Sequence, residues 1–248
     1  MHSNQVNDFP DPTLAPADID LIAISAFDST GFPLELNSNI VWPKLTSFGS
    51  NWDPETLAAA YSVGLFPMPY EIDGQESAIG WWSPHSRAIF HPGEIHVSRS
   101  LKIARRKFRV TVDCDFAAVI RACANPDRES GWINDEVISA FTTLHHLGIA
   151  HSVEVWDRDG RLAGGLYGLE LGGVFAGESM FHAATNASKV ALAHLGELLN
   201  DGSGRIIDTQ WMTSHLESMG AKPMARREYC GNLPKLLDIP PLISSATI

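Results

Sequence analysis

Between residues 151 and 207 the sequence has the pattern of three strands, a helix and a fourth strand. These elements are expected at 151–156, 161–170, 174–180, 187–200 and 206–207. Asp159–Gly160 is a typical two-residue hairpin turn, and Gly172–Gly173 marks a second turn. The pattern predicts an antiparallel meander of three strands, followed by a helical connection to a fourth strand.

Acidic and amide side chains follow the last two of these strands. Glu178 comes directly after Gly177, and Asp208 and Gln210 follow Ile206–Ile207. Ligands of α/β proteins bind at strand ends, where side chains converge on a cleft. Apolar surroundings raise the pKa of a carboxyl group and make it a better base near neutral pH. We therefore place the chemistry at Glu178, Asp208 and Gln210.

A carboxylate at the end of a strand can instead cap the next helix. This alternative is serious for Asp208, because Trp211–Met219 has a helical pattern that Gly220 closes. It is weaker for Glu178, since Ser179–His182 is not an obvious helix start.

The rest of the chain gives a mixed pattern of helices and strands. Helices are expected at 53–63, 98–107, 116–123 and 136–147, and strands at 21–24, 87–90 and 108–113. The apolar, proline-broken stretches 66–69 and 81–84 are expected to be either packed loops or ligand-lining segments. We expect loops in the proline-rich residues 1–45 and make no prediction after Tyr229.

The chain is acidic but contains one strongly basic segment. Its 248 residues include 18 Lys and Arg against 29 Asp and Glu, a net charge of −11. Such a charge excludes non-specific binding of nucleic acid over the whole surface. The basic segment contains Arg99, Lys102, Arg105, Arg106, Lys107 and Arg109. It predicts either a phosphate-binding patch or a solvated helix face balanced by acids elsewhere.

Other features argue against a membrane protein or a metalloprotein. No apolar run approaches the roughly 20 residues that span a bilayer, and the first residues lack the pattern of a signal peptide. The three cysteines have no disulfide or metal-knuckle spacing, so we expect a cytoplasmic protein. His145 and His146 face different sides of a helix, and with His151 they do not predict a metal site. The chain has no GxSxG, P-loop or HExxH motif.

The order of meander, helix and strand resembles the acetyltransferase superfamily that uses coenzyme A, the GNAT-type fold. That superfamily holds pyrophosphate in a glycine-rich loop after its central strand. The equivalent stretch here, Phe181–Lys189, contains no glycine. We therefore expect the scaffold without the coenzyme A site.

A longer series of motifs, from about Gly49 to Leu233, resembles the leucyl/phenylalanyl-tRNA–protein transferase family. The matching blocks are Gly64–Pro67, Trp81–Pro84 with Arg87, Ser98–Leu101, Trp132–Ile133, Leu147–Trp156, Gly164–Gly168, Gly177–Phe181, Asn186–Lys189, Asp208–Gln210 and His215–Ala221. The resemblance implies an α/β (α+β) enzyme with a small N-terminal domain, 1–85, and a GNAT-type aminoacyl-transfer domain, 86–248. It also implies that no cofactor is needed, since the tRNA ester is already activated.

The activity that this resemblance implies is transfer of Leu or Phe from aminoacyl-tRNA to the α-amino group of proteins that begin with Arg or Lys. The product is an N-terminal degradation signal, and we expect a cytoplasmic monomer. Gln210 would help to draw a proton from the amine, Asp208 would orient Gln210, and Glu178 would hold the terminal adenosine and the aminoacyl group. Trp132 would stack on the adenine. An apolar pocket for the Leu or Phe side chain would comprise Leu166, Phe175, Met180, Leu192, Leu195 and Ile207. The basic segment would meet acceptor-stem phosphates.

The sequence departs from the family pattern mainly near its start. Gly49–Trp52 replaces the usual Gly-Gly-Asp-Leu, and Met68 stands where an aromatic residue is expected. These changes leave the preference among Leu, Phe and Met open. Three alternatives remain: the same donor with a different acceptor, a tRNA-binding module without catalysis, and an ordinary acetyltransferase.

Overall fold

The computed structural model describes residues 19–21, 52–72, 75–125 and 132–243. The loops expected in residues 1–45 and most of the strand expected at 21–24 lie outside the described residues. The structure describes a strand, β1, at Ile19–Leu21, which shares only Leu21 with that expected strand. Among the described residues, no helix is long and apolar enough to span a membrane.

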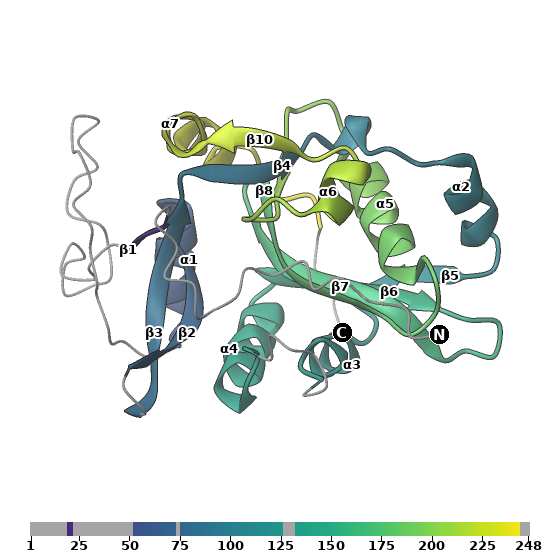
Figure 1. Ribbon diagram of the computed structural model, residues 1–248, viewed down its shortest axis with the longest axis horizontal. Coiled ribbons are helices and arrows are strands. Elements are labelled where there is room, and N and C mark those ends of the chain that lie inside the picture. The colour runs from purple at the N-terminus through teal and green to yellow at the C-terminus, as the bar shows by residue number, and fades with distance from the viewer. Residues whose placement is uncertain (1–18, 22–51, 73–74, 126–131, 244–248) are drawn as a thin grey trace.

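A seven-stranded sheet forms the centre of the molecule, with the order β10-β4-β9-β8-β7-β6-β5 (Figure 1). Its strands are β4 (Ser86–Phe90), β5 (Arg109–Val112), β6 (Ala150–Trp156), β7 (Leu162–Leu171), β8 (Val174–His182), β9 (Ile206–Asp208) and β10 (Lys222–Ala225). All neighbours are antiparallel except β8 and β9, which are parallel. The predicted meander, β6-β7-β8, and its helical connection to a fourth strand are confirmed.

A second, three-stranded sheet has the order β1-β3-β2, where β2 is Phe66–Ile72 and β3 is Gln75–Pro84. The interpretation of 66–69 and 81–84 as loops is therefore wrong, since Phe66 pairs with Trp82 and Pro67 with Trp81. Prolines are tolerated in β2 because it is an edge strand, where a missing N–H need not leave a ladder bond unmade.

The helices begin largely where the sequence predicts. They are α1 (Pro54–Ser62), α2 (Arg99–Arg105), α3 (Phe116–Cys123), α4 (Asp135–His146), α5 (Ala187–Leu199), α6 (Ser214–Ser218) and α7 (Arg226–Leu237), with a 3-10 turn at Pro92–Glu94. Ser98, Asp115 and Asn134 accept hydrogen bonds from the backbone as N-caps of α2, α3 and α4. One expectation fails, because α6 begins at Ser214 rather than at Trp211. Helix α7 lies largely in the part of the chain for which no prediction was made.

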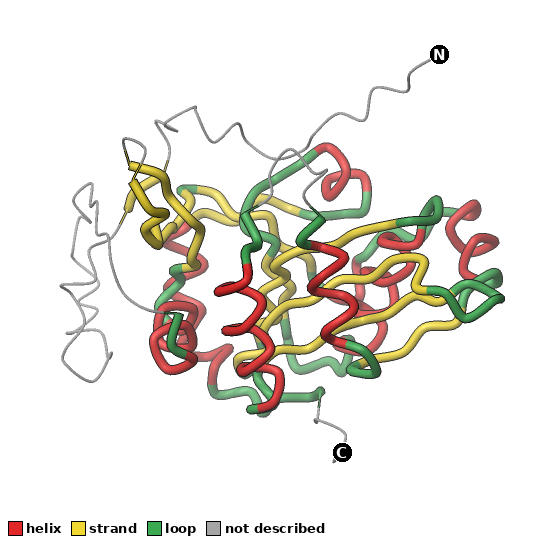
Figure 2. The backbone as a smooth tube through the Cα atoms, turned by 90° about the horizontal axis from the view of Figure 1, so that it is seen from below, coloured by secondary structure: helices red, strands yellow, loops and turns green. Residues whose placement is uncertain are grey.

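The helices cover both faces of the large sheet. Helices α3 and α4 lie on one face and α5 on the other (Figure 1), and the view from below in Figure 2 shows helices crossing in front of the strands. Each face has its own apolar cluster. Val119, Phe141 and Tyr167 are fully buried on the α3–α4 side, and Val190 and Leu192 of α5 are buried on the other.

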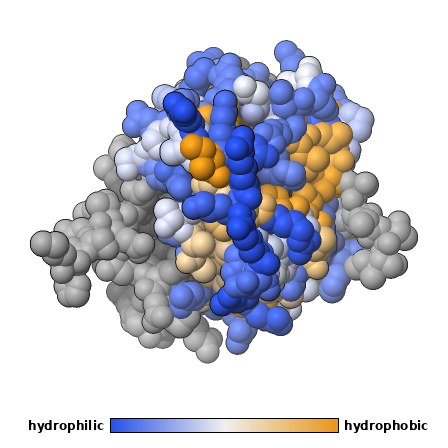
Figure 3. Space-filling model, turned by 90° about the vertical axis from the view of Figure 1, so that its right-hand side faces the viewer, coloured by the Kyte–Doolittle hydropathy of each residue, from blue (hydrophilic) through white to orange (hydrophobic). Residues whose placement is uncertain are grey.

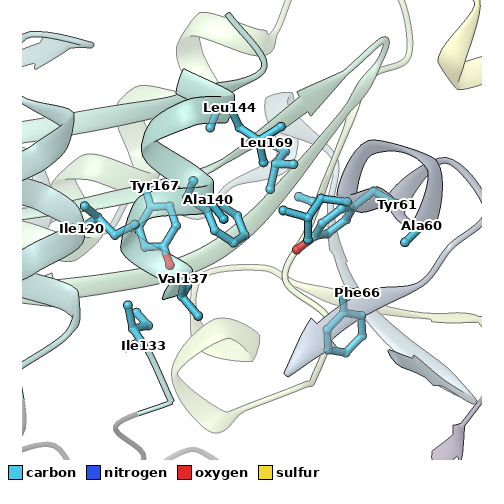
Figure 4. Close-up of a cluster of buried hydrophobic side chains, with 14 of the residues drawn as sticks. Ala60, Tyr61, Phe66, Ile120, Ile133, Val137, Ala140, Leu144, Tyr167 and Leu169 are labelled. Atoms are coloured by element: carbon cyan, nitrogen blue, oxygen red, sulfur yellow. The ribbon is translucent and has the colours of Figure 1, made fainter. Parts of the chain in front are cut away.

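The cluster on the α3–α4 side also contains residues of the N-terminal segment. Leu57, Ala60 and Tyr61 of α1 belong to it together with Trp81 of β3. Figure 4 shows the ring of Tyr61 pointing toward Leu169 of β7 and the side chains that α4 contributes. The expected division at residues 85 and 86 therefore cuts through a continuous hydrophobic core, and the domain boundary remains a prediction.

Candidate active site

The two parallel strands β8 and β9 separate beside the predicted site. They pair from Val174 to Ala176 and from Ile206 to Asp208. Beyond Ala176, β8 continues along β7, whereas the chain after Asp208 continues along β4. There Thr209 N donates to Ala88 O at 2.9 Å, and Ala88 N donates to Gln210 O at 3.0 Å. Glu178 and Gln210 thus lie just past the point of divergence, where ligands of α/β sheets bind.

A β-bulge places Glu178 in this position. Tyr167 of β7 pairs with Ser179 and Gly168 pairs with Gly177, which leaves Glu178 as the extra residue on β8. A bulge redirects the side chain that it carries and commonly lies next to an active site. In a regular strand Phe175 and Met180, five residues apart, would face opposite sides of the sheet. With the bulge between them, both pack against the cluster at α5.

Asp208 and Gln210 are linked to each other and to Glu178. Asp208 Oδ1 accepts a hydrogen bond from Gln210 N at 2.9 Å, and Gln210 Nε2 donates to Glu178 Oε1 at 3.3 Å. Gln210 has a left-handed backbone with φ of 59°. The structure therefore brings together the three residues that the sequence singles out. The alternative role of Asp208 as a helix cap is wrong, since Thr213 caps α6 and accepts from Leu216 N.

Arg87 completes this cluster, and its role was not predicted from the sequence. Its Nη1 donates to Asp208 Oδ2 at 2.5 Å, and its Nη2 donates to the carbonyl oxygen of Gly64. Both members of the ion pair are almost fully buried. One signal was available, because Arg87 precedes Ala88–Phe90 in a strand that was expected to be apolar. A charge on a buried strand indicates a buried partner.

Two tyrosines stand beside the carboxylates. Burial raises the pKa of Tyr61 most, and the charge of nearby Glu178 raises it further. Burial likewise raises the pKa of Tyr229, with a smaller contribution from Asp208. The Tyr61 hydroxyl lies close to Glu178, although its geometry falls outside that of an ordinary hydrogen bond. Helices α1 and α7 thus both contribute to the site, and neither tyrosine was predicted.

Burial raises the pKa of Glu178 from 4.5 to about 8. The charge of Asp208 also raises the pKa, whereas contact with Tyr61 and the charge of Arg87 lower it. The residue as a whole keeps some solvent contact, so the desolvated part is the carboxyl group that faces Tyr61 and Gln210. A carboxyl group with a pKa near neutrality can both accept and donate a proton at physiological pH.

The apolar residues expected to bind the Leu or Phe side chain belong to one cluster, formed between α5 and the sheet. Leu166, Phe175, Leu192, Leu195 and Ile207 are at most 4% exposed, and Met180 is partly buried against the same cluster. Met180 is thus the member of this set that meets solvent. Trp132 belongs to a different cluster and is partly buried on the α3–α4 side, as are Met68 and Trp211.

The predicted basic patch lies at the far edge of the sheet. It occupies α2 and β5, and β5 is three strands from β8, roughly 14 Å at the usual strand spacing. Arg99, Lys102, Arg106, Lys107 and Arg109 are exposed there. Arg105 instead forms a two-pronged ion pair with Glu197 of α5, with one N–O distance of 2.6 Å. Figure 3 shows that this end of the molecule is largely hydrophilic.

Within the described residues, no three His, Cys, Asp or Glu side chains are grouped as metal ligands. His145 Nδ1 lies 2.9 Å from Ala150 O, and His151 Nδ1 lies 2.7 Å from Asp113 Oδ2. Both histidines are therefore held by local partners.

The mixed sheet and the carboxylate–amide cluster at its diverging strands define an α/β protein with a candidate acid–base site. Comparison with known proteins specifies it further. Residues 51–85 match the model of the leucyl/phenylalanyl-tRNA protein transferase N-terminal domain, and residues 89–234 match that of the leucyl/phenylalanyl-tRNA protein transferase. The chain therefore belongs to this family and is an aminoacyltransferase.

Individual relatives are similar over most of their length. The chain is 48% identical to a leucyl/phenylalanyl-tRNA–protein transferase of Azoarcus sp. (strain BH72), over 77% of this chain and 81% of the relative. It is 47% identical to the protein of that name from Azotobacter vinelandii, over 86% of this chain and 94% of the relative. A solved, functionally unknown protein from Staphylococcus epidermidis is only distantly similar, with a TM-score of 0.40 and 11% identity. The match covers 73% of this chain and 67% of that protein.

Proposed function

We propose that this chain transfers leucyl or phenylalanyl groups from aminoacyl-tRNA to the α-amino group of proteins that begin with Arg or Lys. Methionyl groups are a further candidate donor. The product would carry an N-terminal degradation signal. The observation that carries the proposal is the hydrogen-bonded cluster of Glu178, Gln210 and Asp208, found in a chain whose relatives bear names that state the donor and the protein acceptor.

The reaction would proceed by attack of the acceptor amine on the ester carbonyl of the aminoacyl-tRNA. The nitrogen lone pair forms the new amide bond, the carbonyl electrons move to oxygen and return, and the ribose oxygen leaves with the bonding pair. The amine loses one proton and the ribose oxygen gains one. The ester is already activated, so holding the amine against the carbonyl supplies much of the acceleration.

Gln210 is suited to orient the attacking amine. Its Nε2 is directed at Glu178 Oε1, so its amide oxygen faces away from Glu178 and can accept a hydrogen bond from the amine. Asp208 holds the backbone of Gln210, because its Oδ1 accepts a hydrogen bond from the backbone N–H of Gln210. Glu178, with its pKa raised to about 8, is suited to exchange a proton with the amine or the ribose oxygen as the bonds change.

Donor recognition would use surfaces on both sides of the site. Trp132 would stack on the terminal adenine, and Met180 with its buried neighbours would receive the Leu or Phe side chain. The exposed cations of α2 and β5 would contact acceptor-stem phosphates, whereas Arg105 is engaged by Glu197. We further propose a cytoplasmic monomer that needs no cofactor.

The test is transfer of radiolabelled Phe or Leu from charged tRNA to a peptide that begins with Arg. The controls are the same peptide with an acetylated N-terminus, the variant Asp208→Ala, and Asp159→Ala on an exposed turn. We expect transfer only to the free amine, lost in Asp208→Ala and kept in Asp159→Ala.

The competing functions predict different results. Tight binding of charged tRNA without transfer to any peptide would exclude the proposed reaction and favour a binding module. Transfer to an amine other than the Arg or Lys peptides would favour a different acceptor. Stabilisation of the fold by acetyl-coenzyme A would instead indicate an ordinary acetyltransferase.

A further inference from the structure

We propose that Arg87 is a positioning residue of the transfer reaction, which acts through Asp208 to hold Gln210 in its working orientation. The inference rests on the proposed function, because Gln210 is the group that it positions. Arg87 is only 2% exposed, so its guanidinium does not meet the substrates. Its contribution must therefore pass through the groups that it contacts.

The guanidinium of Arg87 is fixed on several sides. It donates to Asp208 Oδ2 and to the carbonyl oxygen of Gly64. Its central carbon lies 4.2 Å from the ring centroid of Tyr229 and 5.5 Å from that of Phe66. These contacts come from β9, from the turn after α1, from α7 and from β2. A planar, always charged group with five donors is suited to such a junction, and a lysine is not an equivalent replacement.

The carboxylate of Asp208 divides its oxygens between Arg87 and Gln210. Oδ2 accepts from Arg87, and Oδ1 accepts from Gln210 N at 2.9 Å. Gln210 needs this support because its φ of 59° is unfavourable for a residue with a side chain. Asp208 is 1% exposed, so without Arg87 its carboxylate would be buried with no cation beside it. The carboxylate would then be free to rotate toward its other contacts, such as Tyr229, and Gln210 N–H would lose its fixed acceptor.

A second contact reaches the other side of Gln210. Phe66, which stacks near Arg87, meets Trp211 edge to face at 4.9 Å. Trp211 is the residue that follows Gln210. The position of Gln210 is therefore fixed before it by Asp208 and after it by Trp211, and Arg87 contacts a partner on each side.

The competing explanation is that Arg87 only stabilises the fold. Arg205 offers a matched control, because it is also buried and pairs with two carboxylates, Glu170 and Asp201, at the opposite end of β9. If Arg87 acts only on stability, Arg87→Met and Arg205→Met will have the same kind of effect. If Arg87 positions Gln210, only Arg87→Met will change the hydrogen exchange of the Gln210 amide, and it will lower the rate of transfer more than Arg205→Met.

The first measurement is amide hydrogen exchange at Gln210, which does not depend on any activity. In Arg87→Met we expect Gln210 N–H to exchange at least about fivefold faster, as for the loss of one hydrogen bond. The amide of Leu169 in β7 should keep its rate. Arg205→Met should leave Gln210 unchanged within about twofold. Wild-type protection of Gln210 in Arg87→Met would overturn the inference.

The second measurement is steady-state transfer of Phe to the Arg peptide. We expect Arg87→Met to lower kcat by about 100-fold, the loss typical of a small misplacement of a reacting group. KM for charged tRNA should stay within about threefold. Arg87→Lys should recover part of kcat, because one ammonium can reach either Asp208 or the Gly64 carbonyl. Equal losses of kcat in Arg87→Met and Arg205→Met, measured on folded protein, would overturn the inference.

The experiments distinguish failure of the proposed transfer activity from failure of the proposed role of Arg87. Absence of transfer by the wild-type protein, together with a Gln210 amide that depends on Arg87, would refute the proposed function and leave the structural role of Arg87. Normal transfer with no special effect of Arg87 would refute only the role of Arg87. If Arg87→Met does not fold, Arg87→Lys carries both tests, and wild-type exchange and kcat in that variant would overturn the inference.

Discussion

Replacement of Glu178 by glutamine should make the protein more stable at alkaline pH and leave its stability unchanged in acid. The pKa of Glu178 is raised from 4.5 to about 8, so the folded protein holds a proton there that the unfolded chain releases. The difference corresponds to at most about 5 kcal/mol of unfolding free energy. Because Glu178 keeps some solvent contact, we expect roughly 2–3 kcal/mol.

The sign follows from proton binding. Below about pH 4.5 Glu178 is protonated in both states and the substitution should have little effect. Between about 4.5 and 8 the folded state binds more protons than the unfolded state, so wild-type stability falls as the pH rises. Above about pH 8 the full difference is reached. Glutamine mimics the protonated acid and removes this dependence.

The assay is urea unfolding of wild type, Glu178→Gln and the exposed control Glu217→Gln at intervals from pH 5 to pH 9. Other titrating groups cancel when each variant is compared with wild type at the same pH. We expect the advantage of Glu178→Gln to grow with pH, whereas Glu217→Gln should track wild type. A constant difference between Glu178→Gln and wild type across this range would refute the reasoning.

Three further substitutions test other parts of the structure. Gly168→Ala should destabilise the protein by about 1–3 kcal/mol in urea unfolding, because the added methyl would overlap the Ala176 carbonyl and the Phe175 ring; a wild-type midpoint would contradict this. Glu170→Ala should free the last described residues, since Glu170 accepts from Leu242 N and Ile243 N, and limited proteolysis should then remove them. Arg106→Ala should leave stability within about 0.5 kcal/mol and reduce the salt dependence of charged-tRNA binding by about one phosphate contact; an unchanged salt slope would remove Arg106 from the donor surface.

The sequence identified the central part of the fold because its local signals agree with one another. The strand-forming residues of β6 and β7, the turn at Gly160 and the capping side chain of Asn134 each depend only on a few neighbouring residues. The same holds for Glu178 and Asp208, which were placed by the strands that they follow. The contacts that join the two acids through Gln210 depend on the sheet order, and the sequence alone does not encode that order in any local pattern.

The missed elements have identifiable physical causes. Pro67 in β2 suggested a loop, and only its position on a sheet edge makes a strand acceptable. Helix α7 has a polar first turn and contains Pro234, so its helical period is weak. Arg87 was overlooked as a functional residue because its partner Asp208 lies 121 residues away. Long-range pairing of this kind becomes visible only when the topology is known.

The stacking of Tyr229 on Arg87 has a consequence for biosynthesis. Tyr229 belongs to α7, the last helix of the described chain, whereas Tyr61 and Gly64 belong to its first helix and the following turn. Domains fold during synthesis from their N-terminal end. A growing chain can form the meander early, but it cannot complete the surroundings of Arg87 until α7 has left the ribosome. The enzyme is therefore expected to be inactive as a nascent chain, even when charged tRNA is abundant around the ribosome that makes it.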